Sequence, residues 1–370
     1  MDFYGDNVAN IGNRSEYDVR GQERWFVIIA AYDLAVDAFL VLSGFLVSHV
    51  LLVQLKKRDG EFTWRDLGLH YLHRYWRLTP IYLAVMLVYL PFDKGCRNYW
   101  WTNLLYINNH FMEPEQQCTG SSWYLGVDMQ LHIIAPALII SQYKKPQMGI
   151  IVNLLLVVLS WACSLWPLNT IAEQVGCVNY YFWAPARMGP YIMGILLAYL
   201  LFKTRSTVPN TRATKAWMSV GWAIGTSLVA VLVGAPSVFR ASDPEVTWMR
   251  SSFERLLFSS AICWVIYACC VGYGGIISEF LSWKVWLPLS RLSYVAYLMH
   301  PLVLYAFYGH YRGPIFYSGY TWFILFAGLS VWIFTGAFVF SVGVEMPFTA
   351  LGKHILPRRH GRKHEDVKAT

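Results

Sequence analysis

Charged side chains are scarce in this sequence. Only 14% of its 370 residues are Asp, Glu, Lys or Arg, whereas a soluble domain usually has about 25%. The hydrophobic fraction is 56% and the aromatic fraction is 17%. This balance excludes an ordinary soluble globular protein and indicates a polytopic membrane protein.

Several other patterns are missing. No cysteine spacing resembles a zinc site, and we predict no metal site. No internal repeat is visible, which counts against an inverted-repeat transporter. The glycine-rich turn at 272–275 lacks the preceding strand and following helix of a dinucleotide-binding motif. No apolar run precedes residue 34, so we expect no cleavable signal peptide.

Long apolar segments dominate the rest of the chain. A segment needs roughly 17–25 mostly apolar residues to cross a bilayer as a helix. Nine segments qualify, with approximate cores at 34–55, 75–92, 122–142, 148–168, 187–202, 216–234, 255–272, 287–309 and 320–342. The predicted fold class is therefore all-α, a polytopic membrane helix bundle with about nine transmembrane helices.

The positive charges indicate an orientation. If the N-terminus is outside and the nine spans alternate, most of the 30 Lys and Arg residues fall on the cytoplasmic side, as the positive-inside rule requires. The net charge of +8 then indicates contact with anionic lipid or an anionic cytosolic ligand, and not with nucleic acid. We predict an extracytoplasmic segment 1–33, a transmembrane domain 34–347 and a basic cytoplasmic tail 348–370.

Two sequence features agree with this orientation. Asn13 begins a glycosylation sequon that is usable only if the N-terminal segment is lumenal. Cys96 and Cys118 flank a predicted outside loop, where an oxidising compartment permits a disulfide. Cys177 also lies on the outside, with Cys163 as a possible partner.

The segment 36–47 carries an acidic residue within an apolar run. At 100° per residue, Asp33, Asp37, Gly44 and Ser48 fall on one stripe of a helix. Larger apolar side chains point away from that stripe, namely Phe39, Leu42, Leu46 and Val53. A carboxylate in a membrane must find a partner or stay protonated, so Asp37 is a candidate functional residue.

A basic helical face precedes the second apolar segment. His70, His73, Arg74 and Arg77 share one side of a helix at spacings of three and four residues. They could be an interfacial group that reaches toward lipid phosphates. They could also form a cytosolic phosphate site, because clustered arginines suit phosphate geometry.

Three further segments contain polar residues at membrane depth. Asp128 and His132 are four residues apart on one face, so the carboxylate could hold the imidazole in one tautomer. Arg187 lies at the outer end of its segment, where it could be a simple interfacial residue. One face of the 287–309 segment carries Ser290, Ser293, Tyr294, Tyr297 and His300. That face suits proton handling or substrate contact, but also plain hydrogen bonds between helices.

Six motifs occur in order along the chain. They are VDAFLVLSGFL from Val36, RYWRLTPIY from Arg74, WYLGVDMQ from Trp123, RMGPYIMG from Arg187, LSRLSYVAYLMH from Leu289 and EMP from Glu345. This set resembles the integral-membrane acyltransferase-3 proteins, in the branch called nose-resistant-to-fluoxetine proteins of invertebrates. The resemblance covers nearly the whole chain.

The resemblance implies transfer of an acyl group from a thioester donor to a hydroxyl acceptor on or across the membrane. No bound cofactor is implied, and acyl-coenzyme A is the expected co-substrate. The expected partners are membrane lipid, the acyl donor and a small-molecule or lipid acceptor, within an endomembrane or the plasma membrane. An intramembrane His would act as the base. The candidate catalytic residues are Asp37, Asp128, His132 and His300; the donor-phosphate residues are His73, Arg74 and Arg77; the supporting polar residues are Ser43, Arg187, Arg291, Tyr294, Tyr297 and Glu345.

The sequence departs from the family in one respect. Relatives carry a helix before the Asp37 segment that bears the His usually taken as catalytic, and this chain begins just after the place where that helix would end. We therefore expect either an alternative start or a shortened form, in which His132 or His300 would replace the missing base. Two other functions stay open: a transporter of lipid or small hydrophobic molecules, and a catalytically inactive form retained for assembly with a partner.

Overall fold

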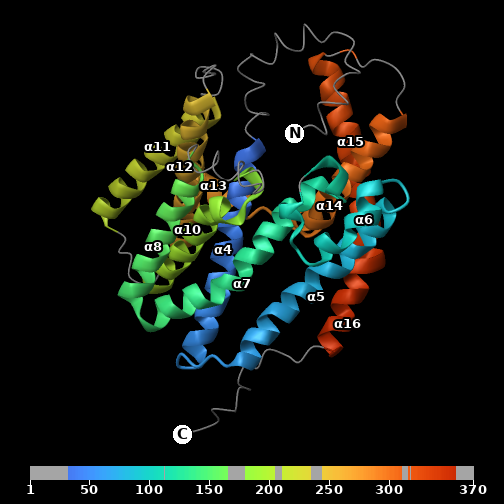
Figure 1. Ribbon diagram of the computed structural model, residues 1–370. Helices are drawn as coiled ribbons and strands as arrows, with labels where there is room; N and C mark the ends of the chain where they lie inside the picture. The colour runs from blue at the N-terminus through green and yellow to red at the C-terminus, as the bar shows by residue number, and fades with distance from the viewer. Residues whose placement is uncertain are drawn as a thin grey trace.

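The described part of the chain is helical throughout. The computed structural model describes residues 32–111, 113–165, 180–204, 211–234, 244–310, 316 and 318–355 (Figure 1). Within these ranges there is no β-strand. The helices are α4 (Tyr32–Lys57), α5 (Trp64–Tyr89), α6 (Lys94–Leu104), α7 (Trp123–Lys144), α8 (Pro146–Cys163), α10 (Ala184–Thr204), α11 (Arg212–Gly234), α12 (Pro244–Val271), α13 (Gly275–Leu281), α14 (Trp286–His310), α15 (Gly319–Phe340) and α16 (Met346–Ile355), with a π-helical turn, η7 (Ser341–Glu345), between the last two.

Seven of the nine expected spans are helices that are long and apolar enough to cross a membrane. They cover Leu34–Lys57, Gly120–Lys144, Pro146–Cys163, Ala184–Thr204, Arg212–Val233, Ser252–Val271 and Gly319–Ile355. The other two expected spans, 75–92 and 287–309, fall on α5 and α14. Both are long helices, but they are not among these seven, and α5 carries charged residues. The chain is thus a multi-pass membrane protein, while the count of nine and the orientation of the termini stay predictions.

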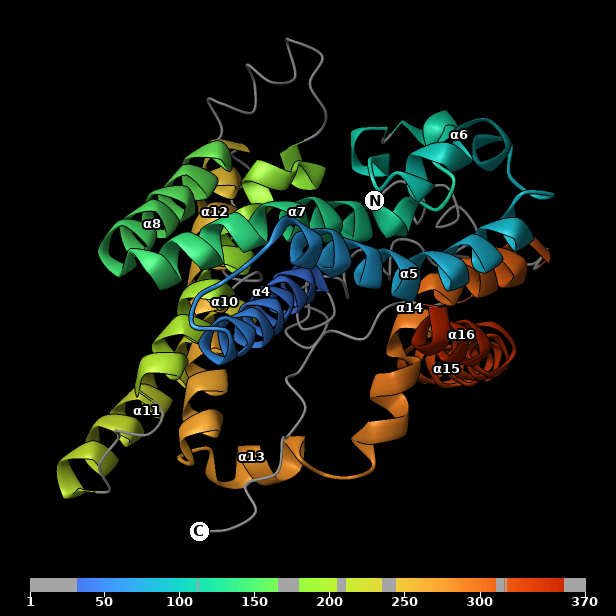
Figure 2. The same cartoon turned by 90° about the horizontal axis from the view of Figure 1, so that it is seen from below.

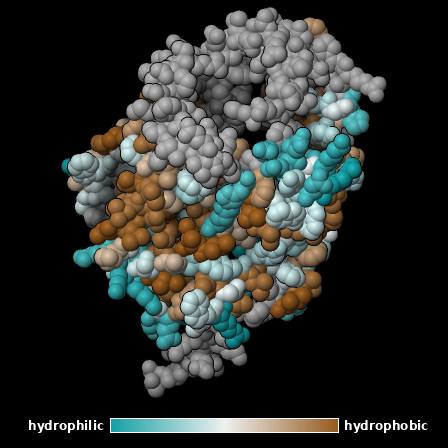
Figure 3. Space-filling view, in the orientation of Figure 1, coloured by the Kyte–Doolittle hydropathy of each residue, from teal (hydrophilic) through white to brown (hydrophobic). Residues whose placement is uncertain are grey.

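The surface agrees with this assignment. Large apolar side chains are exposed along many helices, among them Phe39, Leu46, Leu155 and Phe326. Figure 3 shows apolar residues across the middle of the visible face, with hydrophilic residues mostly toward its margins. A surface of this kind suits contact with lipid, because lipid tails are as apolar as these side chains.

Two apolar cores share helix α7. The first core joins α4, α7, α8 and α10, and the second joins α5, α7, α14 and α15. In Figure 1, α8, α10, α11 and α12 lie on one side of the molecule and α14, α15 and α16 on the other, with α4 and α7 between them. Val127 and Leu131 of α7 belong to the first core, and Leu125 and Met129 to the second. The one helix therefore holds the two groups of helices together.

Helices α4 and α10 pack with their backbones in direct contact. A Cβ added to Gly44 would meet the Tyr191 carbonyl oxygen, and a Cβ added to Gly194 would meet the backbone of Val41 and Phe45. Small residues at a membrane helix interface permit such close approach. The predicted stripe is confirmed from Asp37 to Ser48, because both of these residues are fully buried while Phe39, Leu42 and Leu46 are exposed. The side chain of Asp33, the fourth residue of the stripe, lies outside the described part.

The N-terminus of α5 is fixed by a capping box. The Thr63 hydroxyl accepts from the Asp66 N–H at 3.3 Å, and the Asp66 carboxylate accepts from the Thr63 N–H at 3.0 Å. Arg58, from the preceding turn, pairs with Asp66 at 2.6 Å. Desolvation opposes ionisation of Asp66, but the bonds from Thr63 and Arg58 outweigh it and lower the pKa of this carboxyl. These contacts set where the basic face of α5 begins.

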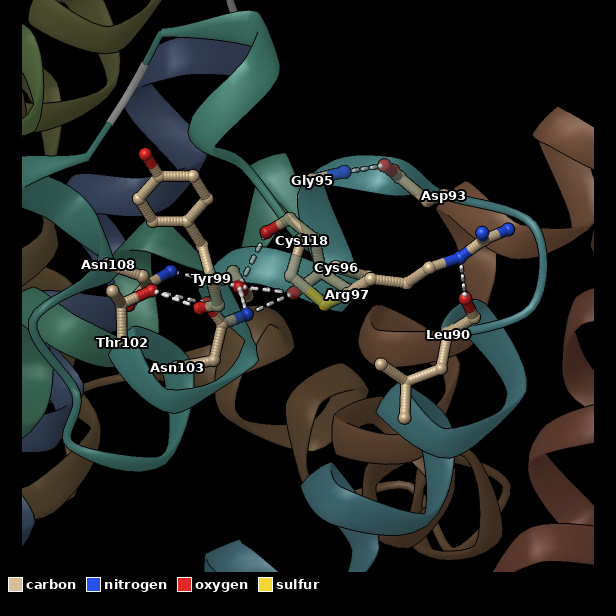
Figure 4. Close-up of a disulfide and its surroundings, with 12 residues drawn as sticks. Leu90, Asp93, Gly95, Cys96, Arg97, Tyr99, Thr102, Asn103, Asn108 and Cys118 are labelled. Carbon is tan, nitrogen blue, oxygen red and sulfur yellow. Dashed lines mark hydrogen bonds between the residues drawn. A yellow bond between two sulfur atoms is a disulfide. The ribbon is translucent and has the colours of Figure 1, made fainter.

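The predicted disulfide is confirmed. Cys96 of α6 is bonded to Cys118 in the loop that leads to α7 (Figure 4). Cys163 is not disulfide-bonded, and Cys177 lies outside the described residues, as does the predicted glycosylation site Asn13.

Part of the predicted C-terminal tail is a packed helix. Helix α16 extends through Ile355, and its Phe348 carbonyl accepts a hydrogen bond of 3.1 Å from the Trp76 indole of α5. Gly352 lies against the same indole, so that a Cβ at this position would collide with it. Helix α16 thus belongs to the packed bundle, and residues 356–370 lie outside the described part.

Replacing Gly44 by Ala should destabilise the protein. The added methyl group collides with the α10 backbone, and such overpacking typically costs about 1–3 kcal/mol. Thermal unfolding of the detergent-solubilised protein, followed by gel filtration with fluorescence detection, should show a lower midpoint. Gly328→Ala in α15 is the matched control, because nothing lies within 4 Å of the added Cβ, and Ala favours a helix by about 1 kcal/mol over Gly. An unchanged midpoint for Gly44→Ala would contradict the close approach of α4 and α10.

Candidate functional site

A fully buried ion pair joins α4 to α10. The Arg187 guanidinium donates to the Asp37 carboxylate at 2.9 Å, and both side chains are almost completely buried. The Arg187 Nε donates to the Tyr181 carbonyl at 3.0 Å, and its guanidinium lies 4.2 Å from the centre of the Tyr181 ring. Trp123 of α7 packs on the same guanidinium at 5.3 Å. Arg187 is therefore the partner that the Asp37 carboxylate needs, and it does not extend to the membrane surface.

A second polar cluster lies where α4, α5 and α7 meet. Ser43 donates to one oxygen of the Asp128 carboxylate at 2.6 Å. Arg74 forms an ion pair with the other oxygen. The guanidinium also lies 3.5 Å from the Ser43 hydroxyl. Three helices thus contribute one group each to an almost enclosed charged cluster.

His132 joins this cluster through Arg74. Its Nδ1 lies 3.3 Å from Nη1 of Arg74. Arginine can only donate, so Nδ1 must accept, and the proton of this neutral imidazole is on Nε2. The guanidinium therefore lies between His132 and Asp128, which share the face of α7 that their spacing predicts. His70 of α5 stacks on the His132 ring, with 4.3 Å between centroids.

The polar face of α14 is tied to its neighbours by hydrogen bonds. Tyr294 donates to the Leu78 carbonyl of α5 at 2.9 Å, and Tyr297 donates to the Ser121 carbonyl just before α7. The Tyr297 ring also lies 6.1 Å from the ring of Tyr124, one turn before Asp128. Bonds between helices, one of the two interpretations of this face, account for both tyrosines.

His300 has the opposite tautomer from His132. Its Nδ1 lies 2.6 Å from the Tyr297 carbonyl oxygen. A carbonyl can only accept, so Nδ1 carries the proton and Nε2 has the lone pair. A neutral imidazole held in this way can take a proton through Nε2.

The remaining candidates are on or near the surface. Arg77 and Arg291 are exposed and make no ion pair with any residue that the structure describes, and His73 is half-buried. Glu345 lies in the π-helical turn η7, where it accepts from Ser341 at 2.7 Å. The structure thus groups Ser43, Arg74, Asp128 and His132, places Asp37 with Arg187, and leaves Arg77 and Arg291 apart from both.

The loop between α5 and α7 covers one end of this region. Gln130 of α7 donates to the Tyr106 carbonyl at 2.9 Å and to the Asn109 side chain at 2.7 Å. Tyr106 adopts a φ of 57°, in the left-handed region that is costly for a tyrosine. Its hydroxyl lies 3.1 Å from Thr79 of α5, and burial raises its pKa, so the phenol stays protonated. These bonds tie the loop to α5 and α7.

Sequence reasoning missed the roles of His70 and Tyr181. The sequence pattern places His70 on the basic face of α5, four residues before Arg74. Its stacking on His132 does not follow from that pattern, because it depends on how α5 meets α7. Tyr181 lies in a 3-10 turn, η5 (Tyr180–Phe182), and no periodicity indicates that it contacts Arg187. Among the described residues no cluster of three or more His, Cys, Asp or Glu side chains could hold a metal ion.

Comparisons with known proteins point to one family. A family described as an acyltransferase domain matches residues 10–342. The chain is 29% identical to nose resistant to fluoxetine protein 6 of Caenorhabditis elegans, over 93% of this chain and 47% of that protein. It is 24% identical to the O-acetyltransferase OatA of Staphylococcus aureus, over 76% of this chain and 48% of that protein.

The relatives are longer than this chain. A third relative, regulator of hypoxia-inducible factor 1 of Caenorhabditis elegans, is 23% identical over 74% of this chain and 60% of its own length. The chain thus spans about half the length of the curated relatives it matches. No solved structure matches it. These comparisons favour neither the transporter nor the inactive form.

Breaking the buried pair of α4 and α10 should destabilise the fold more than removing the whole pair. Asp37→Asn removes the charge that faces the Arg187 guanidinium, and breaking a buried pair in this way typically costs about 3–5 kcal/mol. The double variant Asp37→Leu with Arg187→Met replaces both charges by apolar groups and should recover most of the loss. Thermal unfolding in detergent measures both, with the exposed Glu279→Gln as the control for loss of one carboxylate. Equal stability of Asp37→Asn and the unaltered protein would show that the pair is dispensable for folding.

Proposed function

The chain belongs to the acyltransferase-3 family, and on this basis we propose that it transfers an acyl group from a thioester donor, such as acyl-coenzyme A, to a hydroxyl acceptor. The relative OatA is named an O-acetyltransferase, which supports a hydroxyl as the acceptor group. The observation that carries the proposal is the cluster of Ser43, Arg74, Asp128 and His132 inside a membrane helix bundle of this family.

The charged groups of this cluster indicate a function beyond helix packing. Charged groups within membrane-spanning helices are costly and are usually retained for substrates, ions or protons. The cluster involves α4, α5 and α7, three of the segments whose motifs resemble the family. Helix packing alone could use apolar side chains, which often replace a buried ion pair without loss of stability. We therefore place the reaction next to this cluster.

His300 is the base in this proposal. Its Nδ1–H is held by the Tyr297 carbonyl, so its Nε2 lone pair can take the proton of the acceptor hydroxyl. The acceptor oxygen then attacks the thioester carbonyl carbon, the carbon–sulfur bond breaks, and the carrier leaves as a thiol that receives the proton. His132 is less suited, because the Nδ1 lone pair of its neutral form accepts from Arg74. The Tyr297 ring, next to His300, lies 6.1 Å from the ring of Tyr124, which is one turn before Asp128 on α7.

Arg77 holds the phosphates of the donor in this proposal, with His73 beside it. Arg74, on the same helical face, is committed to Asp128, so binding a phosphate would first require loss of that ion pair. Arg77 is exposed and can present its planar fork of N–H donors to a phosphate. We assign Arg74 to the buried site, where Asp128 and Ser43 fix its orientation, and Arg77 to the carrier.

Replacing Arg77 by Gln should weaken donor binding. Loss of hydrogen bonds to a charged group typically costs about 1.5–3 kcal/mol, which corresponds to a rise of roughly 10- to 100-fold in KM for the donor. The measurement is release of free coenzyme A from acetyl-coenzyme A by proteoliposomes that contain the protein and total membrane lipid of the expressing cells. Arg65→Gln, an exposed arginine in the first turn of the same helix, should leave KM unchanged. A similar rise in both variants would exclude a specific phosphate contact at Arg77.

Replacing His300 by Gln should reduce kcat by about 10²–10⁴-fold, because a general base typically contributes that much to the rate. KM for the donor should not change. His310→Gln is a matched control, because His310 lies on the same helix and bonds through Nδ1 to a backbone carbonyl at 2.8 Å. If His300→Gln keeps the full rate, the base is another group. If the unaltered protein releases no coenzyme A, the proposed function itself is wrong.

A further inference from the structure

Two adjacent cysteines lie at the last turn of α12. Cys269 and Cys270 immediately precede Val271, where the helix ends. Neither forms a disulfide, and both are partly exposed. The Cys269 sulfur lies beside Gly274 and Ser278 at the start of α13. The sequence alone suggests plain apolar packing for these residues, but their position at the helix end puts both thiols next to the connection between two spans.

The connection that follows is apolar and exposed. Helix α13 has no buried residue, and the exposed fraction is 84% for Ile276, 54% for Phe280 and 58% for Trp283. In Figure 2, α13 links α12 to α14 at the lower edge of the view, and α7 lies near the upper edge. Short segments with exposed Trp, Phe and Ile between two membrane helices settle in the interface of the bilayer. The residues of α13 therefore suit the membrane interface, and the two thiols adjoin this segment at the end of α12.

This end of α12 has room for a large reagent and carries positive charge. Val271 and Tyr273 line a cavity of about 570 Å³ together with Lys215 and Trp222 of α11. Lys215 lines this cavity, Lys284 follows α13 in the chain, and both are exposed. Both lysines fall on the side that the charge distribution predicts to be cytoplasmic, where fatty acyl thioesters are available to the chain.

We propose that Cys269 and Cys270 are a site of S-acylation by long-chain fatty acyl groups. Cysteines at the boundary of a membrane span are suited to this reversible modification. The cysteine sulfur attacks the carbonyl carbon of a fatty acyl thioester and forms a new thioester. The carbon–sulfur bond to the carrier breaks, and the carrier leaves as a thiol with the cysteine proton. The transferred chain then lies in the bilayer beside α13, so that the link between α12 and α14 is held at the membrane surface.

The site is tested by exchange of acyl groups for a mass tag. The full chain is expressed in animal cells, free thiols are blocked with N-ethylmaleimide, and thioesters are cleaved with hydroxylamine. The released thiols are then labelled with maleimide-polyethylene glycol. We expect one or two mass shifts that require hydroxylamine, and the double variant Cys269→Ser with Cys270→Ser should lose them. Cys263→Ser is the matched control, because this residue lies on the same helix about 10 Å from Cys270 at 1.5 Å per residue, and this variant should keep every shift of the unaltered protein.

Two results would overturn the proposal. One is the absence of any shift that requires hydroxylamine, and the other is a shift that persists in the double variant. Mass spectrometry of the unaltered protein covers the case in which the double variant does not fold. The peptide that contains Cys269 and Cys270 should carry a long-chain acyl mass, and recovery of this peptide only without that mass contradicts the proposal.

Discussion

Charge that is taken into a membrane helix bundle must be neutralised within it, and two ion pairs meet this requirement here. Asp37 with Arg187 joins α4 to α10, and Asp128 with Arg74 joins α7 to α5. The cost of an unpaired charge in such surroundings is much larger than that of a lost apolar contact. Each pair therefore restricts the rotation of both of its helices. The glycine contacts between α4 and α10 then fit only that rotation.

Helix α7 contacts both of these ion pairs and so connects the helices that they join. Its Trp123 packs on Arg187, its Asp128 binds Arg74, and its Gln130 holds the loop that also contains the disulfide partner Cys118. The residues between these polar groups alternate between the two apolar cores. A change at α7 consequently reaches the α4–α10 pair, the α5 arginine and the covering loop together. The proposed reaction site lies beside the Asp128–Arg74 pair.

The sequence predicts which face of a helix is buried better than it predicts which other helices pack against that face. The buried stripe of α4 follows from spacing, because Asp37, Gly44 and Ser48 recur on one side of any regular helix. The disulfide follows from the position of Cys96 and Cys118 in one loop. The partner of Asp128 does not follow, because periodicity shows that Asp128 and Arg74 each lie on a helical face but not that α5 crosses α7 at that level.

The unbroken run of helix from Gly319 to Ile355 is too long to lie wholly within the hydrocarbon layer of a membrane without a steep tilt. Its 37 residues, at about 1.5 Å per residue, extend roughly 55 Å, while the hydrocarbon layer is only about 30 Å thick. Unless the helix tilts steeply, at least one of its ends must leave the hydrocarbon. Phe348 lies in its last turns and receives the hydrogen bond from Trp76, so the adjacent Arg77 lies near the C-terminal end of the run. If that end is the one that leaves the hydrocarbon, the length of this helix brings Arg77 to the level at which a water-soluble, phosphate-bearing donor would meet the protein.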